Sequence, residues 1–166
     1  MTTVETRTGS QIGRSHPRLD AGEKLRGQAQ FAGDLLVPRM LHGRVLRSPF
    51  AHARIAALDV SAAEAMPEVV CVLTGKDLAD IDPYYGHAIK DRPIVAIDKV
   101  RFHGEPVAAV AAETPAAAAA ALDTIHVEYE DLPVVATLDD ALADGATLVN
   151  DRSTRPGLFH GLGELP

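Results

Sequence analysis

The chain has 166 residues, enough for one ordinary domain with tails and a buried core. Its net charge of −7 argues against a nucleic-acid-binding protein, which needs a basic face, and against binding to an anionic membrane surface. The single cysteine excludes an internal disulfide and a cysteine-ligated iron–sulfur cluster within this chain. No apolar run reaches the roughly 20 residues of a membrane span, and a cytoplasmic location is the simplest expectation.

The N-terminal residues of the chain are polar, and the first predicted strands come after them. Residues 1–20 are polar and lack periodicity, so they are expected to form an extended arm. Residues 40–47 and 54–60 predict two strands. Ser48 and Pro49 separate them, because proline cannot occupy a central strand.

Three short elements are expected next. Residues 61–66 predict a helix with Ser61 as N-cap and a glutamate three residues on, which is a capping box. The β-branched run VVCVL predicts a buried strand at 69–73, in which Cys71 would be an inert thiol. Residues 74–78 predict one helical turn.

The pattern then fails over residues 79–93 (ADIDPYYGHAIKDRP). This segment has no period and contains two prolines and a glycine. Its chemistry is concentrated in Tyr84, Tyr85, His87 and Lys90. A loop of this length inside a compact domain is often functional or ordered by a partner.

The most regular stretch lies between residues 98 and 133. Gly104 and Pro106 bracket a turn, and the run VAAVAA that follows predicts a strand covered on both faces. Thr114 and Pro115 predict a helix start, and the alanine run after them allows the helix to lie close to a sheet. The alternation from Ile125 to Glu130 then predicts a half-buried strand.

The remainder completes a mixed α/β (α+β) fold with short strands and two or three short helices. After Pro133 a short strand and a helix at 138–143 are expected. The predicted organisation is an arm at 1–20, one domain at 21–144 and a linker-like tail at 145–166.

The residues themselves point to no catalytic or metal site. Glu105 could be a general acid or base, but a turn carboxylate that meets a backbone N–H, Arg101 or His103 is favoured. The histidines show no metal-ligand spacing. His52 and Arg54 are the best exceptions, and an interface contact and a purely local role both stay open for them.

The ordered set of motifs resembles a known family. The characteristic pieces are SPFAHARI, GEPVAAVAAET and VEYEDLP, in this order and spacing. They lie within the segments 24–34, 40–63, 69–78, 93–122 and 127–135. The set is similar to the N-terminal α/β-hammerhead domain of the molybdopterin-binding large subunit of the xanthine dehydrogenase, aldehyde oxidase and carbon monoxide dehydrogenase family.

The resemblance implies a part of a larger oxidoreductase. In that family, an aldehyde or an N-heteroaromatic carbon is hydroxylated with oxygen from water, and electrons pass through iron–sulfur clusters to flavin. The resemblance implies molybdopterin dinucleotide, iron–sulfur clusters and FAD in the full complex, with molybdopterin-binding domains and iron–sulfur and flavin subunits as partners. The family's catalytic base and pterin ligands lie in later domains, so this chain alone is expected to be inactive and to bind none of these cofactors.

The resemblance also gives the long loop a role at the mouth of the substrate funnel. The residues expected to shape access are Tyr84, Tyr85, His87, Ile89 and Lys90. An alternative is a stand-alone binding or assembly module that kept the fold without catalysis. A small independent hydrolase is disfavoured, because no nucleophile–base pair is recognisable.

Overall fold

The computed structural model describes residues 13, 15–86 and 90–150. Contacts divide the chain into two compact units after Pro38. The first unit contains a short helix α1 (Ala21–Leu25) and a 3₁₀ turn η1 (Ala32–Asp34). The domain boundaries predicted at residues 20 and 144 stay predictions.

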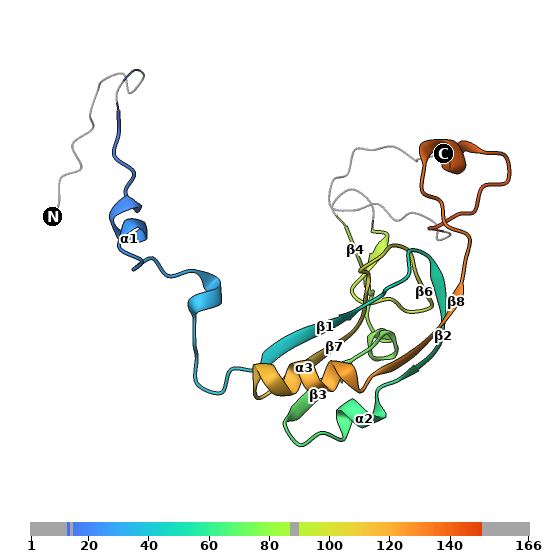
Figure 1. Ribbon diagram of the computed structural model, residues 1–166, viewed down its shortest axis with the longest axis horizontal. Coiled ribbons are helices and arrows are strands. Elements are labelled where there is room, and N and C mark those ends of the chain that lie inside the picture. Colours follow the sequence, from blue (N-terminus) through green and yellow to red (C-terminus); the bar gives the residue numbers. More distant parts are fainter. Residues whose placement is uncertain (1–12, 14, 87–89, 151–166) are drawn as a thin grey trace. The chain divides into compact units, whose positions relative to one another are not determined.

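The second unit is a mixture of short strands and short helices, as the sequence predicts (Figure 1). In chain order its elements are β1 (His42–Arg47), β2 (Ala53–Asp59), α2 (Ser61–Glu64), β3 (Val69–Leu73), η2 (Gly75–Leu78), β4 (Tyr84–Tyr85), β5 (Arg92–Pro93), β6 (Lys99–Val100), β7 (Pro106–Ala112), α3 (Pro115–Asp123), β8 (His126–Asp131) and α4 (Leu138–Leu142). None of the helices among the described residues has the length and apolar character needed to cross a bilayer.

One sheet has the strand order β1-β7-β3, with β7 antiparallel to both neighbours. The VAAVAA run supplies its central strand, and α3 lies across one face of the sheet (Figure 1). Ala108 and Val110 of β7 pack with Ala121 of α3 and with Ile125 in the core between them. The predicted strand forms, but the expected cover on both faces is not met: Ala108, Val110 and Ala112 are buried on the α3 side, whereas Ala109 and Ala111 on the other face are half-buried.

Helix α3 begins where the sequence predicts. The Thr114 hydroxyl accepts a hydrogen bond from the Ala117 N–H at 3.1 Å, and Pro115 occupies the first turn. Ala118 and Ala121 are fully buried, because their small side chains let the helix backbone approach the sheet.

The other three-stranded sheet of the described residues has the order β6-β2-β8. Ala53 and Val100 of this sheet pack in the core against Val107 of β7. The ring centroids of Phe50 and Tyr129 lie 4.8 Å apart and extend this cluster. Along β8 exposed and half-buried residues alternate, which confirms the predicted pattern.

The predicted cap of α2 is wrong. The helix begins at Ser61, so Val60 occupies the N-cap position and its apolar side chain supplies no cap. Asp59, the last residue of β2, reaches forward and accepts the Ser61 N–H at 3.0 Å. The Ser61 hydroxyl and the Ser61 N–H, which both hydrogen-bond to the Asp59 carboxyl, hold the pKa of this carboxyl below its ordinary value.

Two expectations for strands also need correction. The strand at 69–73 forms, but it is an edge strand, so Val70 and Cys71 are exposed and the thiol is not buried. The segment after Pro133 forms no strand over residues 134–137 and leads directly into α4.

Candidate functional site

The long loop contains a small sheet that the sequence did not predict. Tyr84 pairs with Pro93 and Tyr85 with Arg92, which makes β4 and β5 antiparallel partners. Tyr84 is half-buried, whereas the Tyr85 side chain is 54% exposed. The pairing therefore presents one tyrosine to solvent and folds the other against the chain.

The other predicted funnel residues lie between these two strands. Lys90 is half-buried, whereas His87 and Ile89 lie outside the described residues. The structure thus brings Tyr84 and Tyr85 together on one strand.

The loop is attached to the body of the domain at its exit. The Ile94 N–H donates to the Pro83 carbonyl at 2.9 Å, which extends the β4–β5 pairing by one hydrogen bond. Pro93 is buried, and Val95 and Ala96 are 2% and 1% exposed. Strand β5 (Arg92–Pro93) thus leads directly into core residues.

The HGEP turn lies at the start of β7. Gly104 has φ of 88°, a conformation that side chains with a Cβ rarely adopt. The Gly104 N–H donates to the Ser48 carbonyl at 2.8 Å, and the Ser48 N–H donates to the Glu105 carbonyl at 2.9 Å. Two backbone hydrogen bonds therefore join the HGEP turn to Ser48, in the Ser48-Pro49 break between β1 and β2.

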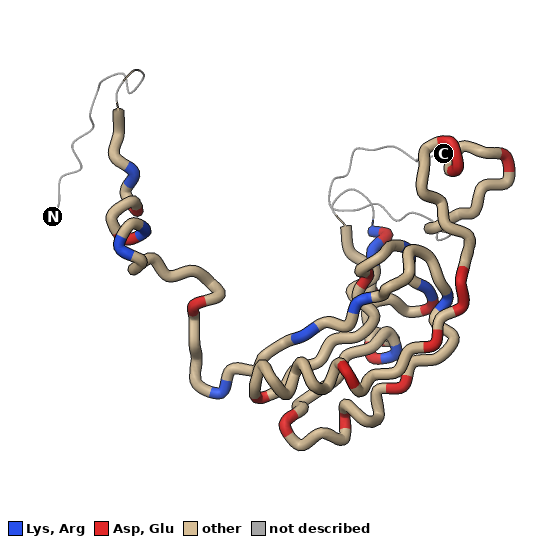
Figure 2. Tube along the Cα trace, in the orientation of Figure 1, with Lys and Arg blue, Asp and Glu red and all other residues tan. Residues whose placement is uncertain are grey.

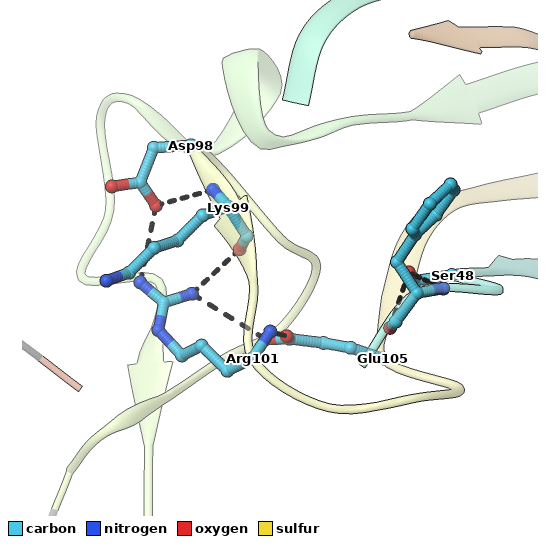
Figure 3. Close-up of polar contacts among 6 residues, drawn as sticks. Ser48, Asp98, Lys99, Arg101 and Glu105 are labelled. Atoms are coloured by element: carbon cyan, nitrogen blue, oxygen red, sulfur yellow. Dashed lines mark hydrogen bonds and ion pairs between the residues drawn. The ribbon is translucent and has the colours of Figure 1, made fainter. Parts of the chain in front are cut away.

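The side chain of Glu105 is 2% exposed and serves this turn (Figure 3). Its carboxylate accepts the Arg101 N–H and lies 3.7 Å from the Arg101 guanidinium. Burial raises the pKa of the Glu105 carboxyl above its ordinary value, and the Arg101 N–H and charge act in the opposite direction. This geometry occupies the carboxylate with internal partners, and no nucleophile contacts it among the described residues.

Arg101 links the turn to the strand before it. Its guanidinium donates to the Lys99 carbonyl at 2.9 Å and to Asp98 at 3.3 Å (Figure 3). Sequence reasoning named Arg101 only as a possible partner of Glu105 and missed Asp98. The spacing of Asp98, Arg101 and Glu105 in DKVRFHGE, at i, i+3 and i+7, was the available signal.

A cavity lies between the loop exit and this turn. Its volume is about 380 Å³. The lining residues are Asp91, Arg92, Pro93, Arg101, Phe102, Glu105, Val149 and Asn150. The segments that form it are far apart in sequence, so no local pattern could have predicted it.

His52 and Arg54 have different surroundings. His52 is 3% exposed and its Nδ1 lies 2.7 Å from the Pro133 carbonyl, which joins the start of β2 to the chain after β8. Its Nε2 atom is buried, with no hydrogen-bond partner among the described residues. Arg54 is exposed and lies 3.4 Å from Glu130. The local role is the one that this geometry supports for His52.

The described residues offer no donor set for a metal. No group of three or more His, Cys, Asp or Glu side chains comes together in the part of the chain that is described. Acidic residues instead line β8 as an exposed row (Figure 2). The side chains of the described residues therefore do not fit a molybdenum site.

Comparison with known proteins agrees with this fold. Residues 26–133 match the family described as aldehyde oxidase and xanthine dehydrogenase, a/b hammerhead domain. The chain belongs to this family, and its matched residues form the hammerhead domain. The fold class and family predicted from the sequence are confirmed.

Individual relatives agree. The chain is 39% identical, over 139 residues, to the nicotinate dehydrogenase large molybdopterin subunit of Eubacterium barkeri. This match covers 84% of this chain and 32% of that protein. Among solved structures, CO dehydrogenase from Oligotropha carboxidovorans matches with a TM-score of 0.75 and 34% identity over 81% of this chain and 17% of that one. Quinoline 2-oxidoreductase from Pseudomonas putida 86 matches with a TM-score of 0.71 and 39% identity over 79% and 18%. The chain thus spans a third or less of the length of these proteins.

Proposed function

We propose that this chain is the scaffold and substrate-access domain of a molybdenum hydroxylase. In the complete enzyme, an aldehyde or N-heteroaromatic substrate would be hydroxylated with water as the oxygen source. Molybdopterin-binding domains, in cis or in trans, and iron–sulfur and flavin subunits would supply the cofactors. A cytoplasmic location stays a prediction.

The observation that carries this proposal is an exposed aromatic hairpin on a well-packed domain. Tyr85 stands half-exposed on β4, while the core strand β7 contains residues with no exposed surface. Aromatic side chains with a few polar neighbours are typical of substrate-binding walls. Tyr85 is thus suited to contact a ligand without contributing to the core.

Exposed apolar side chains on the second unit support a role inside a larger assembly. Single exposed apolar residues are normal, but contiguous ones mark contact surfaces. Leu138 and Leu142 lie one turn apart on α4 and are 74% and 73% exposed. Such a face favours a domain that packs against further protein over a stand-alone binding module.

The test is Tyr85→Ala in the complete enzyme that contains this chain. We expect the Michaelis constant or the substrate range to change while molybdenum content is retained, because the hairpin carries no metal ligand. Val70→Ala is the matched control, since Val70 is equally exposed at 54% but lies on β3. A loss of molybdenum with unchanged substrate preference would contradict the access role.

Purification of the native complex distinguishes the alternative. Subunits that carry molybdenum, pterin and iron–sulfur clusters should accompany this chain. A lone, metal-free monomer would favour the stand-alone module.

A further inference from the structure

We propose that Gly75 is a positioning residue for the tyrosine hairpin, by which we mean the paired strands β4 and β5. Gly75 begins η2, the helical turn that leads into the long loop, and it contacts the segment through which the same loop returns. We call this contact, between Gly75 and Ala96–Ile97, the neck of the loop. This inference rests on the access role proposed above and identifies the residue that sets where the hairpin lies.

The neck leaves no room for a side chain at position 75. A Cβ built there would lie 2.9 Å from the Ile97 Cα atom and 3.0 Å from the Ala96 carbonyl oxygen. Both atoms belong to the backbone, so a change of rotamer cannot relieve the contact. Gly75 does not have a positive φ, and closeness alone requires glycine here.

One side of the neck is attached to the core. The Ala96 N–H donates to the Pro106 carbonyl at 2.7 Å, and Pro106 is the first residue of the central strand β7. Ala96 is 1% exposed. Displacement of this side would disturb the core, so an added methyl group must move η2 instead.

The other side leads to the tyrosines within a few residues. The Thr74 N–H and hydroxyl donate to the Asp77 carboxylate at 2.7 and 2.8 Å, which makes η2 one rigid turn. The Ile81 N–H donates to the Leu78 carbonyl at 3.3 Å, and Leu78 is 5% exposed. A shift of η2 is therefore transmitted to Pro83 and β4. The pairing of β4 with β5 consists of two residue pairs, with the Ile94–Pro83 hydrogen bond beside them.

The test is Gly75→Ala in the complete enzyme, with Gly43→Ala as control. Gly43 lies on β1 and also lacks a positive φ, but a Cβ there meets no atom within 4 Å. In the Gly75 variant we expect the Ile94 amide, which donates to Pro83, to exchange with solvent roughly tenfold faster. The Michaelis constant for bulky substrates should change about threefold or more, with a smaller change in kcat. The control should show neither effect.

The outcomes separate the two proposals. Unchanged exchange at Ile94 would overturn the positioning role, whatever the kinetics show. Faster exchange with an unchanged Michaelis constant for Gly75→Ala and Tyr85→Ala would retain the neck and overturn the access role. If Gly75→Ala does not accumulate, Asp77→Ala provides the second variant, because it loosens η2 without adding an atom to the neck. It should give the same faster exchange, and its failure to do so would count against the neck.

Discussion

The strand–helix unit β7–α3 and the loop at residues 79–93 are attached to the domain in different ways. Strand β7 pairs with neighbours on both sides and is covered by α3. In the described part of the loop, the pairing of β4 with β5 consists of two residue pairs, with the Ile94–Pro83 hydrogen bond beside them. Many independent contacts define the first region, whereas we propose that the position of the second depends on the close contact between Gly75 and Ala96–Ile97. One short chain thus combines a strand buried in the core with a loop on which Tyr85 is exposed.

The largest effect on stability is expected at the turn that begins β7. Glu105→Ala would leave the buried Arg101 guanidinium without its nearest buried carboxylate, and the loss in unfolding free energy should be about 3 kcal/mol. Denaturant unfolding of the chain measures it. Glu130→Ala is the matched control, because its pair with Arg54 is exposed and should contribute less than about 1 kcal/mol. Equal losses would mean that the turn is not a special anchor of the scaffold.

The helix–sheet contact should give the next effect. Ala118→Leu adds bulk where the side chain has no exposed surface and should destabilise the chain by about 1–3 kcal/mol. Ala119→Leu, one residue along on the exposed side of α3, should leave the unfolding midpoint almost unchanged. A similar loss for both variants would contradict the close packing of α3 on the sheet.

The cap of α3 is expected to contribute less. Thr114→Ala removes the acceptor of the Ala117 N–H and should lower the unfolding free energy by about 1 kcal/mol. Thr114→Ser keeps a hydroxyl at this position and should retain most of that stability. A serine variant as unstable as the alanine variant would assign the effect to the lost methyl group.

The smallest expected effect is a pH dependence at the turn. Burial raises the folded-state pKa of Glu105 above its ordinary value of 4.5. Between pH 4.5 and the folded-state pKa, the folded chain therefore binds more protons than the unfolded chain. Its contribution to stability therefore declines as pH rises from 4.5 through the folded-state pKa. Asp77 behaves oppositely, since hydrogen bonds from Thr74 lower its pKa and its contribution is lost on acidification.

Urea unfolding of the wild-type chain and Glu105→Gln over about pH 4–7 would measure this difference. The glutamine variant should gain relative to the wild type as pH rises. A constant difference across the range would show that burial does not govern the protonation of Glu105.

Where local pattern and packing agree, prediction from the sequence succeeded. The start of α3 at Thr114-Pro115 and the alternation along β8 depend on neighbouring residues, and both are confirmed. The cap of α2 failed because the helix begins at Ser61 itself, so Val60 holds the N-cap position, and the Ser61 N–H donates to the Asp59 carboxylate. The burial of Cys71 failed because an apolar run does not reveal whether its strand lies at the centre or the edge of a sheet.

By itself the sequence determined the family, the mixed fold and the position of most elements, because turn residues and apolar periodicity act over a few positions. Only the tertiary structure decided which loop residues pair, which cavity the turn helps to line and why position 75 must be glycine. These features join segments distant in the chain, such as Gly75 with Ile97 and Arg92 with Asn150. Their geometry depends on how the sheets pack, and no local pattern encodes that packing.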